Sequence, residues 1–186
     1  MTAKRGRSRG TINSLPSKLS RMFRRKENVA KRIGKTKRNV TLDSNVLISY
    51  VVSKGDDTVN KKVVTKSITD DRLMISDVIY DECVAYAKRP KARVTEAEIA
   101  KTLKELGPII NISPVPSDSD LLKKYRIRDA KDLKILYSVD MTDSVILVTM
   151  DDDFTDVEGL KALIMDPPQY LREKGGKKKK PANKRL

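Results

Sequence analysis

One short stretch, Val145–Phe154, limits what this chain can fold into. It begins with four consecutive apolar residues, Val145–Val148, a run short and β-branched enough to predict a buried strand. Three aspartates, Asp151, Asp152 and Asp153, follow almost at once. Carboxylates clustered after a buried strand place negative charge at the carboxyl edge of a sheet, where open α/β folds bind their ligands. Because like charges held close together repel one another, the pattern predicts a divalent cation there.

Charge divides the 186 residues into three parts with a net charge of +15. Residues 1–39 carry 14 Lys or Arg and one acid, and residues 171–186 carry eight and one; residues 40–170 carry 23 acidic and 18 basic residues. We therefore predict a basic N-terminal arm, disordered or partly helical, a central domain over 40–170, and a disordered lysine-rich tail. Such arms are typical of proteins that bind a polyanion. The residues expected to grip nucleic acid are Arg21, Arg24, Arg25, Lys26, Lys177, Lys178, Lys179 and Lys180.

The rarer residue types exclude several classes of protein. A single cysteine, Cys83, rules out an internal disulfide and fits a reducing compartment such as the cytoplasm. The chain has no histidine, so histidine-based catalytic triads and His-ligated zinc are excluded. No apolar run approaches membrane-spanning length, and we expect no membrane partner. The Arg-rich, acid-poor N-terminus also resembles an organellar transit peptide, which stays an open alternative.

Two further acids fall where the expected core meets its edge. Asp43 follows the predicted strand 40–42 and precedes a helix, so it is either a site residue or the helix N-cap. Glu82 lies on a predicted helix, next to an apolar stripe that includes Ile79 and Cys83. Because a carboxylate near the core needs a partner, Glu82 is a better site candidate than Asp81.

Asp132 is the third such acid. It shares one helical face with Ile135 and Leu136, at i, i+3 and i+4, which puts it beside the core at the start of a helix. Asp129 lies three residues earlier, where a capping role fits better. We therefore favour Asp132 over Asp129 as a site residue.

Strands alternate with helices along the central domain. Further short strands are predicted at 73–75 and 109–112, with helices between them, and a break follows at Pro167–Pro168. This alternation indicates an α/β fold with a largely parallel sheet. Asp70 and Asp71 fall in a loop-like setting, where we expect solvated charge.

Four motifs, in this order, resemble the PIN-domain family of ribonucleases. They are D-x-N-V-L at residues 43–47, Ser76 six residues ahead of Glu82, Asp132 opening an apolar helix, and T-x-D-x-D-F at residues 149–154. The resemblance covers residues 40–166, nearly the whole central domain. It implies a PIN-like three-layer α/β/α sandwich with a central, mostly parallel sheet, flanked by the basic flexible arms.

The resemblance also implies an activity and a set of residues for it. The activity is divalent-metal-dependent hydrolysis of RNA phosphodiester bonds, with Asp43, Asp132 and Asp151 as ligands of Mg²⁺ or Mn²⁺. Glu82 and Asp153 would complete the catalytic set or orient water. Asn45 and Thr149 are candidates for hydrogen bonds to these ligands or to phosphate.

The family includes the toxins of many toxin–antitoxin pairs, so an antitoxin-type inhibitor protein, ribosomal RNA or another RNA, and a homodimer are all implied as partners. The basic arms have no counterpart in the compact toxin form, which favours a variant with its own nucleic-acid-binding segments, and a toxin or an RNA-processing role both stay open. Two other interpretations stay open. The chain could be a non-catalytic RNA-binding or ribosome-associated module, or an ordinary α/β domain with scattered surface acids.

Overall fold

The computed structural model describes residues 37–53 and 57–173. The predictions made for the N-terminal arm and for the lysine-rich tail, including all eight nucleic-acid-binding residues named for them, lie outside these residues. Within the described ranges, no helix is both long and apolar enough to cross a lipid bilayer.

Five strands and seven α-helices form in the described part of the chain. The strands are β1 (Asn39–Leu42), β2 (Arg72–Ser76), β3 (Ile109–Ile110), β4 (Ile146–Val148) and β5 (Leu163–Met165). The α-helices are α2 (Ser44–Val52), α3 (Val59–Thr69), α4 (Asp77–Ala87), α5 (Glu96–Leu106), α6 (Asp118–Lys124), α7 (Leu133–Met141) and α8 (Pro167–Arg172). Two 3₁₀ turns, η1 (Ala130–Asp132) and η2 (Asp152–Phe154), precede α7 and follow β4.

The strands make one parallel sheet in the order β3-β2-β1-β4-β5. The chain builds outward from β1 to β2 and β3, then returns to the other side of β1 to add β4 and β5. Val40 pairs with Ile146, and Leu42 pairs with Val148. The strand order therefore reverses between β1 and β4, and α/β proteins bind ligands at the carboxyl ends of the strands at such a point.

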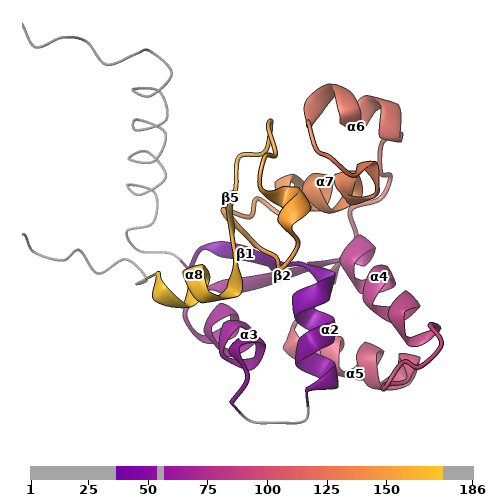
Figure 1. Cartoon of the computed structure of the whole chain (residues 1–186), viewed down its shortest axis with the longest axis vertical. Coiled ribbons are helices and arrows are strands. Elements are labelled where there is room, and N and C mark those ends of the chain that lie inside the picture. The colour runs from indigo at the N-terminus through magenta and orange to yellow at the C-terminus, as the bar shows by residue number, and fades with distance from the viewer. Residues whose placement is uncertain (1–36, 54–56, 174–186) are drawn as a thin grey trace, which may run out of the picture. The chain divides into compact units, whose positions relative to one another are not determined.

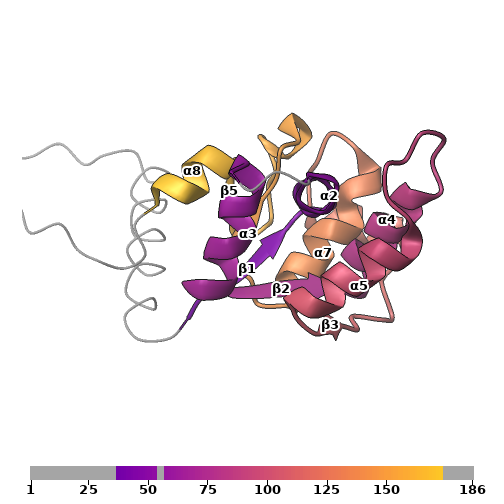
Figure 2. The same ribbon diagram turned by 90° about the horizontal axis from the view of Figure 1, so that it is seen from below.

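Helices cover both faces of the sheet, so the molecule has three layers (Figures 1 and 2). Because successive side chains of a strand point to opposite faces, Ile146 and Val148 pack into one core and Leu147 into the other. The first core contains side chains of α2, α3, α4, α5 and α8, and the second contains those of α6 and α7. The predicted α/β/α sandwich is confirmed.

Local sequence signals set several helix ends. Thr95 and Glu98 form the reciprocal capping box of α5, with the Thr95 amide donating to Glu98 Oε2 at 2.8 Å. Ser76 caps α4 and Ser117 caps α6 through their hydroxyl groups. Each of these caps depends on residues no more than three positions apart, so short sequence patterns encode them.

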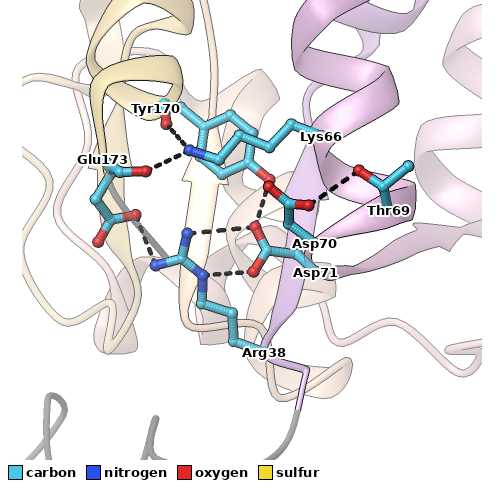
Figure 3. A network of polar contacts seen from close by, with 7 residues as sticks. All are labelled: Arg38, Lys66, Thr69, Asp70, Asp71, Tyr170 and Glu173. Atoms are coloured by element: carbon cyan, nitrogen blue, oxygen red, sulfur yellow. Dashed lines mark hydrogen bonds and ion pairs between the residues drawn. The ribbon is translucent and has the colours of Figure 1, made fainter. Parts of the chain in front are cut away.

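Asp71 corrects one expectation, because its side chain is buried rather than solvated, with 3% of it exposed. Figure 3 shows that Arg38 meets it with two nitrogens, Nε at 2.6 Å and Nη2 at 3.3 Å. The hydroxyl of Tyr170 donates to the same carboxylate at 2.6 Å. Arg38 Nη1 also contacts Glu173 Oε2 at 2.6 Å. Since Arg38 and Asp71 directly precede β1 and β2, this network closes the amino edge of the sheet.

The Pro167–Pro168 pair begins a helix instead of ending the fold. Asp166 caps α8, and the first proline occupies a first-turn position, where its missing N–H costs nothing. Tyr170 of α8 is fully buried in the core formed with α2–α5. The described fold therefore continues through Glu173, three residues beyond the predicted domain boundary.

Candidate active site

The candidate site lies at the carboxyl ends of β1 and β4, where the strand order reverses. Asp43 follows β1 directly, and its amide donates to Val148 O at 2.9 Å, so it lies against the end of β4. Thr149, Met150 and Asp151 continue the chain from β4. Two acids more than 100 residues apart in the chain are thereby brought to one edge of the sheet.

Asp43 is the helix cap that one of the two alternatives predicted, and it also lines the candidate pocket. Its side chain is the N-cap of α2, with the Ser44 amide donating to Oδ1 at 2.6 Å. The Thr149 hydroxyl donates to Oδ2 at 2.6 Å. Asp43 is only 3% exposed. Burial raises its pKa to about 6, with Glu82 and Asp151 adding to the rise and the hydrogen bonds from Thr149 and Ser44 opposing it.

Asn45 and Thr149 fasten α2 to the loop after β4. Asn45 Nδ2 donates to Thr149 Oγ1 at 3.3 Å, and Asn45 Oδ1 accepts from the Met150 amide at 3.3 Å. The Asp151 amide also donates to Thr149 Oγ1, at 3.0 Å. The Thr149 hydroxyl therefore donates its one proton to Asp43 and accepts hydrogen bonds from Asn45 and from the Asp151 amide. This arrangement fixes the orientation of the Asp43 carboxylate.

An open pocket of about 410 Å³ lies in front of Asp43. The residues lining it are Asp43, Ser44, Asn45, Ile48, Ser49, Val52, Glu82, Tyr86, Arg89, Asp132, Ile135 and Asp151. Four of these are acids, and they come from four separate segments: the end of β1, the helix α4, the turn η1 before α7, and the loop after β4. The lining therefore brings together four of the five predicted catalytic acids.

The acids in the pocket disfavour each other's ionisation. Burial raises the pKa of Asp132 to about 6, and Asp151 and Asp129 are the next largest causes. Burial likewise raises the pKa of Glu82, with Asp132 adding to the rise, while Ser44 and Arg89 oppose it. The pocket thus concentrates negative charge that the protein itself compensates poorly.

Asp153 stands apart from the other four acids. It is absent from the pocket lining, and Arg128 Nη1 approaches its Oδ1 at 3.4 Å on an exposed part of the surface. Its amide donates to Asp151 Oδ1 at 2.9 Å, so Asp151 caps the turn η2. Asp129 is likewise a cap, accepting from the Lys131 amide at 2.9 Å in η1. The preference for Asp132 over Asp129 agrees with this placement, because only Asp132 lines the pocket.

The pocket fits a divalent cation in its donor types. Carboxylate oxygens are the ligands that Mg²⁺ and Mn²⁺ prefer. As the side chains stand, no three or more acidic or cysteine side chains in residues 37–53 and 57–173 are grouped as the ligands of one metal ion.

Arg89 and Ser44 are pocket residues that the sequence did not single out. Arg89 lies just beyond the end of α4, seven residues after Glu82, and its guanidinium lies 5.6 Å from the centre of the Tyr86 ring. It is the one cationic residue among those that line the pocket in the described part of the chain. The i+7 spacing from Glu82 would place both on one face if the helix continued, and it is the signal that could have found Arg89.

Comparisons with known proteins agree with this architecture. The chain matches the PIN-domain family over residues 40–160, and it belongs to that family, whose members are generally nucleases. A crystal structure of VapBC2 from Rickettsia felis, bound to a DNA fragment from their promoter, is similar in fold. The match has 14% sequence identity and a TM-score of 0.52, and it covers 69% of this chain and 98% of that chain. A comparison with curated proteins gave no match.

Proposed function

We propose that this protein is a divalent-metal-dependent endoribonuclease that hydrolyses phosphodiester bonds of RNA. The observation that carries the proposal is the convergence of Asp43, Glu82, Asp132 and Asp151, from four segments, on one pocket where the strand order reverses. Membership of a nuclease family supports a hydrolytic role for these acids. The basic segments 1–39 and 171–186 support a polyanionic substrate.

Asp43, Asp132 and Asp151 would hold Mg²⁺ or Mn²⁺, since their oxygens lie around one pocket. When bound, such an ion supplies charge compensation for the phosphodiester and activation of the attacking water. Glu82 completes the acidic lining, and Asp153 has a lesser role because it lies outside the pocket lining and contacts Arg128.

The chain's own residues then orient the reaction. Thr149 holds the Asp43 carboxylate through its 2.6 Å hydrogen bond, so the position of that ligand is set before substrate binds. Glu82, whose pKa is raised by burial, accepts the proton of the attacking water more readily than an ordinary glutamate. Arg89 supplies the positive charge that attracts the scissile phosphate into an acidic pocket.

We also propose cytoplasmic action, regulation by an antitoxin-type inhibitor protein, and a homodimeric state, on the basis of the family resemblance. The similarity to a VapBC2 structure supports the proposal of an antitoxin-type partner.

The test is a cleavage assay with the full chain on a panel of transfer, ribosomal and messenger RNAs. We expect Mg²⁺- or Mn²⁺-dependent cleavage that EDTA abolishes. Asp43→Asn and Asp151→Asn should each lose at least about 100-fold in rate, while Asp81→Asn, an exposed acid beside Glu82, should cleave like the parent. RNA binding that is the same with and without metal, and without cleavage, would instead favour the non-catalytic RNA-binding module.

A further inference from the structure

A second open pocket, of about 530 Å³, runs over α3 and is here called the α3 groove. The residues lining it are Tyr50, Lys61, Lys62, Thr65, Lys66, Thr69 and Asp70. The lining therefore contains three lysines, two threonines and one tyrosine, but only one acid. Amines and hydroxyls bind phosphate oxygens, and aromatic side chains stack with unpaired bases.

The charge of α3 differs from that of its surroundings. Its eleven residues include three lysines and no acid, whereas α4 contains three acids and no lysine or arginine. Residues 40–170 as a whole carry more acids than bases. A basic helix in an acidic domain creates a local positive potential, which attracts a polyanion to that surface.

One end of the α3 groove adjoins the candidate active site. Ser49 lines the acidic pocket, and the next residue, Tyr50, lines the groove. Asn60, which directly precedes the first groove lysine, donates to Ser49 Oγ at 2.7 Å and lies 3.6 Å from the sulfur of Met150 in the loop after β4. The helices α2 and α3 pack side by side (Figure 2), so the contact of Asn60 with Ser49 brings the groove close to the acidic pocket.

The other end of the groove lies beside the last described residues of the chain, Tyr170 and Glu173. Lys66 Nζ donates to Tyr170 O and to Glu173 O, both at 2.5 Å, and lies 4.6 Å from the centre of the Tyr170 ring (Figure 3). Residue 174 follows Glu173, and eight of the last 16 residues of the chain are Lys or Arg. The lysine-rich segment is thus attached to the domain at the end of α3.

Lys62 makes an ion pair that is weak enough for a phosphate to replace its partner. Lys62 pairs with Asp57 at 2.6 Å, but their side chains are 54% and 86% exposed. Exposed pairs of this kind contribute little and are weakened by salt, so a phosphate can replace the aspartate.

We propose that the α3 groove binds the phosphate backbone of single-stranded RNA beside the acidic pocket and leads it along α3 towards Glu173. This rests on the proposed nuclease function for the identity of the ligand. The eleven residues of α3 span about 16 Å, enough for several consecutive phosphates. The groove would separate RNA binding from cleavage. The lysines would bind phosphates on α3, away from the carboxylates of the acidic pocket, which repel phosphate.

The test is the salt dependence of RNA binding by the full chain in EDTA, measured by fluorescence anisotropy with a fluorescein-labelled 16-nucleotide oligouridylate. Lys62→Gln should weaken binding about fivefold at 0.1 M salt and reduce the slope of log K against log salt by about 0.7. The double variant Lys61→Gln/Lys62→Gln should reduce that slope by about 1.4. Lys123→Gln is the matched control, because Lys123 is also exposed, is paired with an exposed aspartate, and lies on α6, across the sheet from α3.

Equal slopes for the parent, Lys62→Gln and Lys123→Gln would overturn the proposal. EDTA removes metal-dependent cleavage from this measurement, so it judges the groove separately from the nuclease. A reduced slope in a protein that never cleaves RNA would uphold the groove and refute the nuclease. Unchanged slopes in a protein that does cleave would refute the groove alone.

Discussion

The two edges of the sheet hold buried aspartates in opposite ways. Asp71, at the amino edge, and Asp43, at the carboxyl edge, are each 3% exposed. Asp71 is neutralised by Arg38 at 2.6 Å and accepts from the Tyr170 hydroxyl. Asp43 accepts only from a hydroxyl and an amide, and the charged groups that raise its pKa are other acids.

The difference shows that the charged groups at one edge of the sheet stabilise the fold, whereas those at the other edge destabilise it. At the amino edge the partners of the acid are built in, so its charge supports the folded state. At the carboxyl edge the acids disfavour one another's ionisation, which costs stability unless a bound ligand compensates their charge. Four predictions test this contrast, beginning with the largest expected effect.

Removing the cation from the amino edge should be the most damaging change. Arg38→Met leaves Asp71 buried with only the Tyr170 hydroxyl as a partner, which should lower the free energy of unfolding by about 3–5 kcal/mol. Urea unfolding at pH 7 measures this. Lys123→Met, which breaks the exposed pair with Asp120, should change stability by less than about 0.5 kcal/mol. A loss below about 1 kcal/mol for Arg38→Met would remove the contrast between the edges.

Adding a cation should have the opposite effect at the carboxyl edge. Mn²⁺ at one hundred times its dissociation constant should raise the free energy of unfolding by about 2.7 kcal/mol, because it binds the folded state alone. The increase should disappear in Asp132→Asn and persist in Asp81→Asn, whose side chain is exposed on α4. Titration of Mn²⁺ during urea unfolding gives the measurement. An equal response in both variants would mean that the ion binds elsewhere.

Thr149 should affect both the stability of the fold and the protonation of the site. Thr149→Val removes a buried hydrogen bond to a carboxylate and should cost about 1.5 kcal/mol, whereas Thr149→Ser keeps the hydroxyl. Because that bond lowers the pKa of Asp43, its loss should move the pH dependence of Mn²⁺ binding to higher pH. Calorimetric titrations between pH 5 and 8 compare the variants. Identical pH profiles for valine and serine would show that the hydroxyl has no such role.

The smallest expected effect is a stabilisation. The pKa of Asp132 is 3.8 as a reference and about 6 in the fold, so between these values the folded state holds more protons than the unfolded state. The free energy of unfolding therefore falls as pH rises from about 4 to 6 and stays lower above it. In EDTA, Asp132→Asn should recover about 1 kcal/mol at pH 7.5, after discounting for its partial exposure, and nothing at pH 3.5. A destabilised Asn variant at pH 7.5 would contradict this.

Sequence patterns alone determined those features that depend on neighbours in the chain. The strand before Asp43 and the position of Asp132 at the start of a helix each follow from residues within about four positions. The order of motifs likewise indicated the α/β/α sandwich and the family. Parallel strands share a carboxyl edge, so the approach of Asp43 to Asp151 followed once the sheet was predicted.

Only the tertiary structure decided which charges are compensated. Asp71 meets Arg38 across 33 positions and Tyr170 across 99, and nothing near Asp71 in the chain marks it as buried. The position of Asp153 outside the pocket and the presence of Arg89 in its lining likewise depend on segments that are far apart in the chain. The energy of a charge depends on its burial and on every charge around it, and those surroundings exist only after the chain has folded.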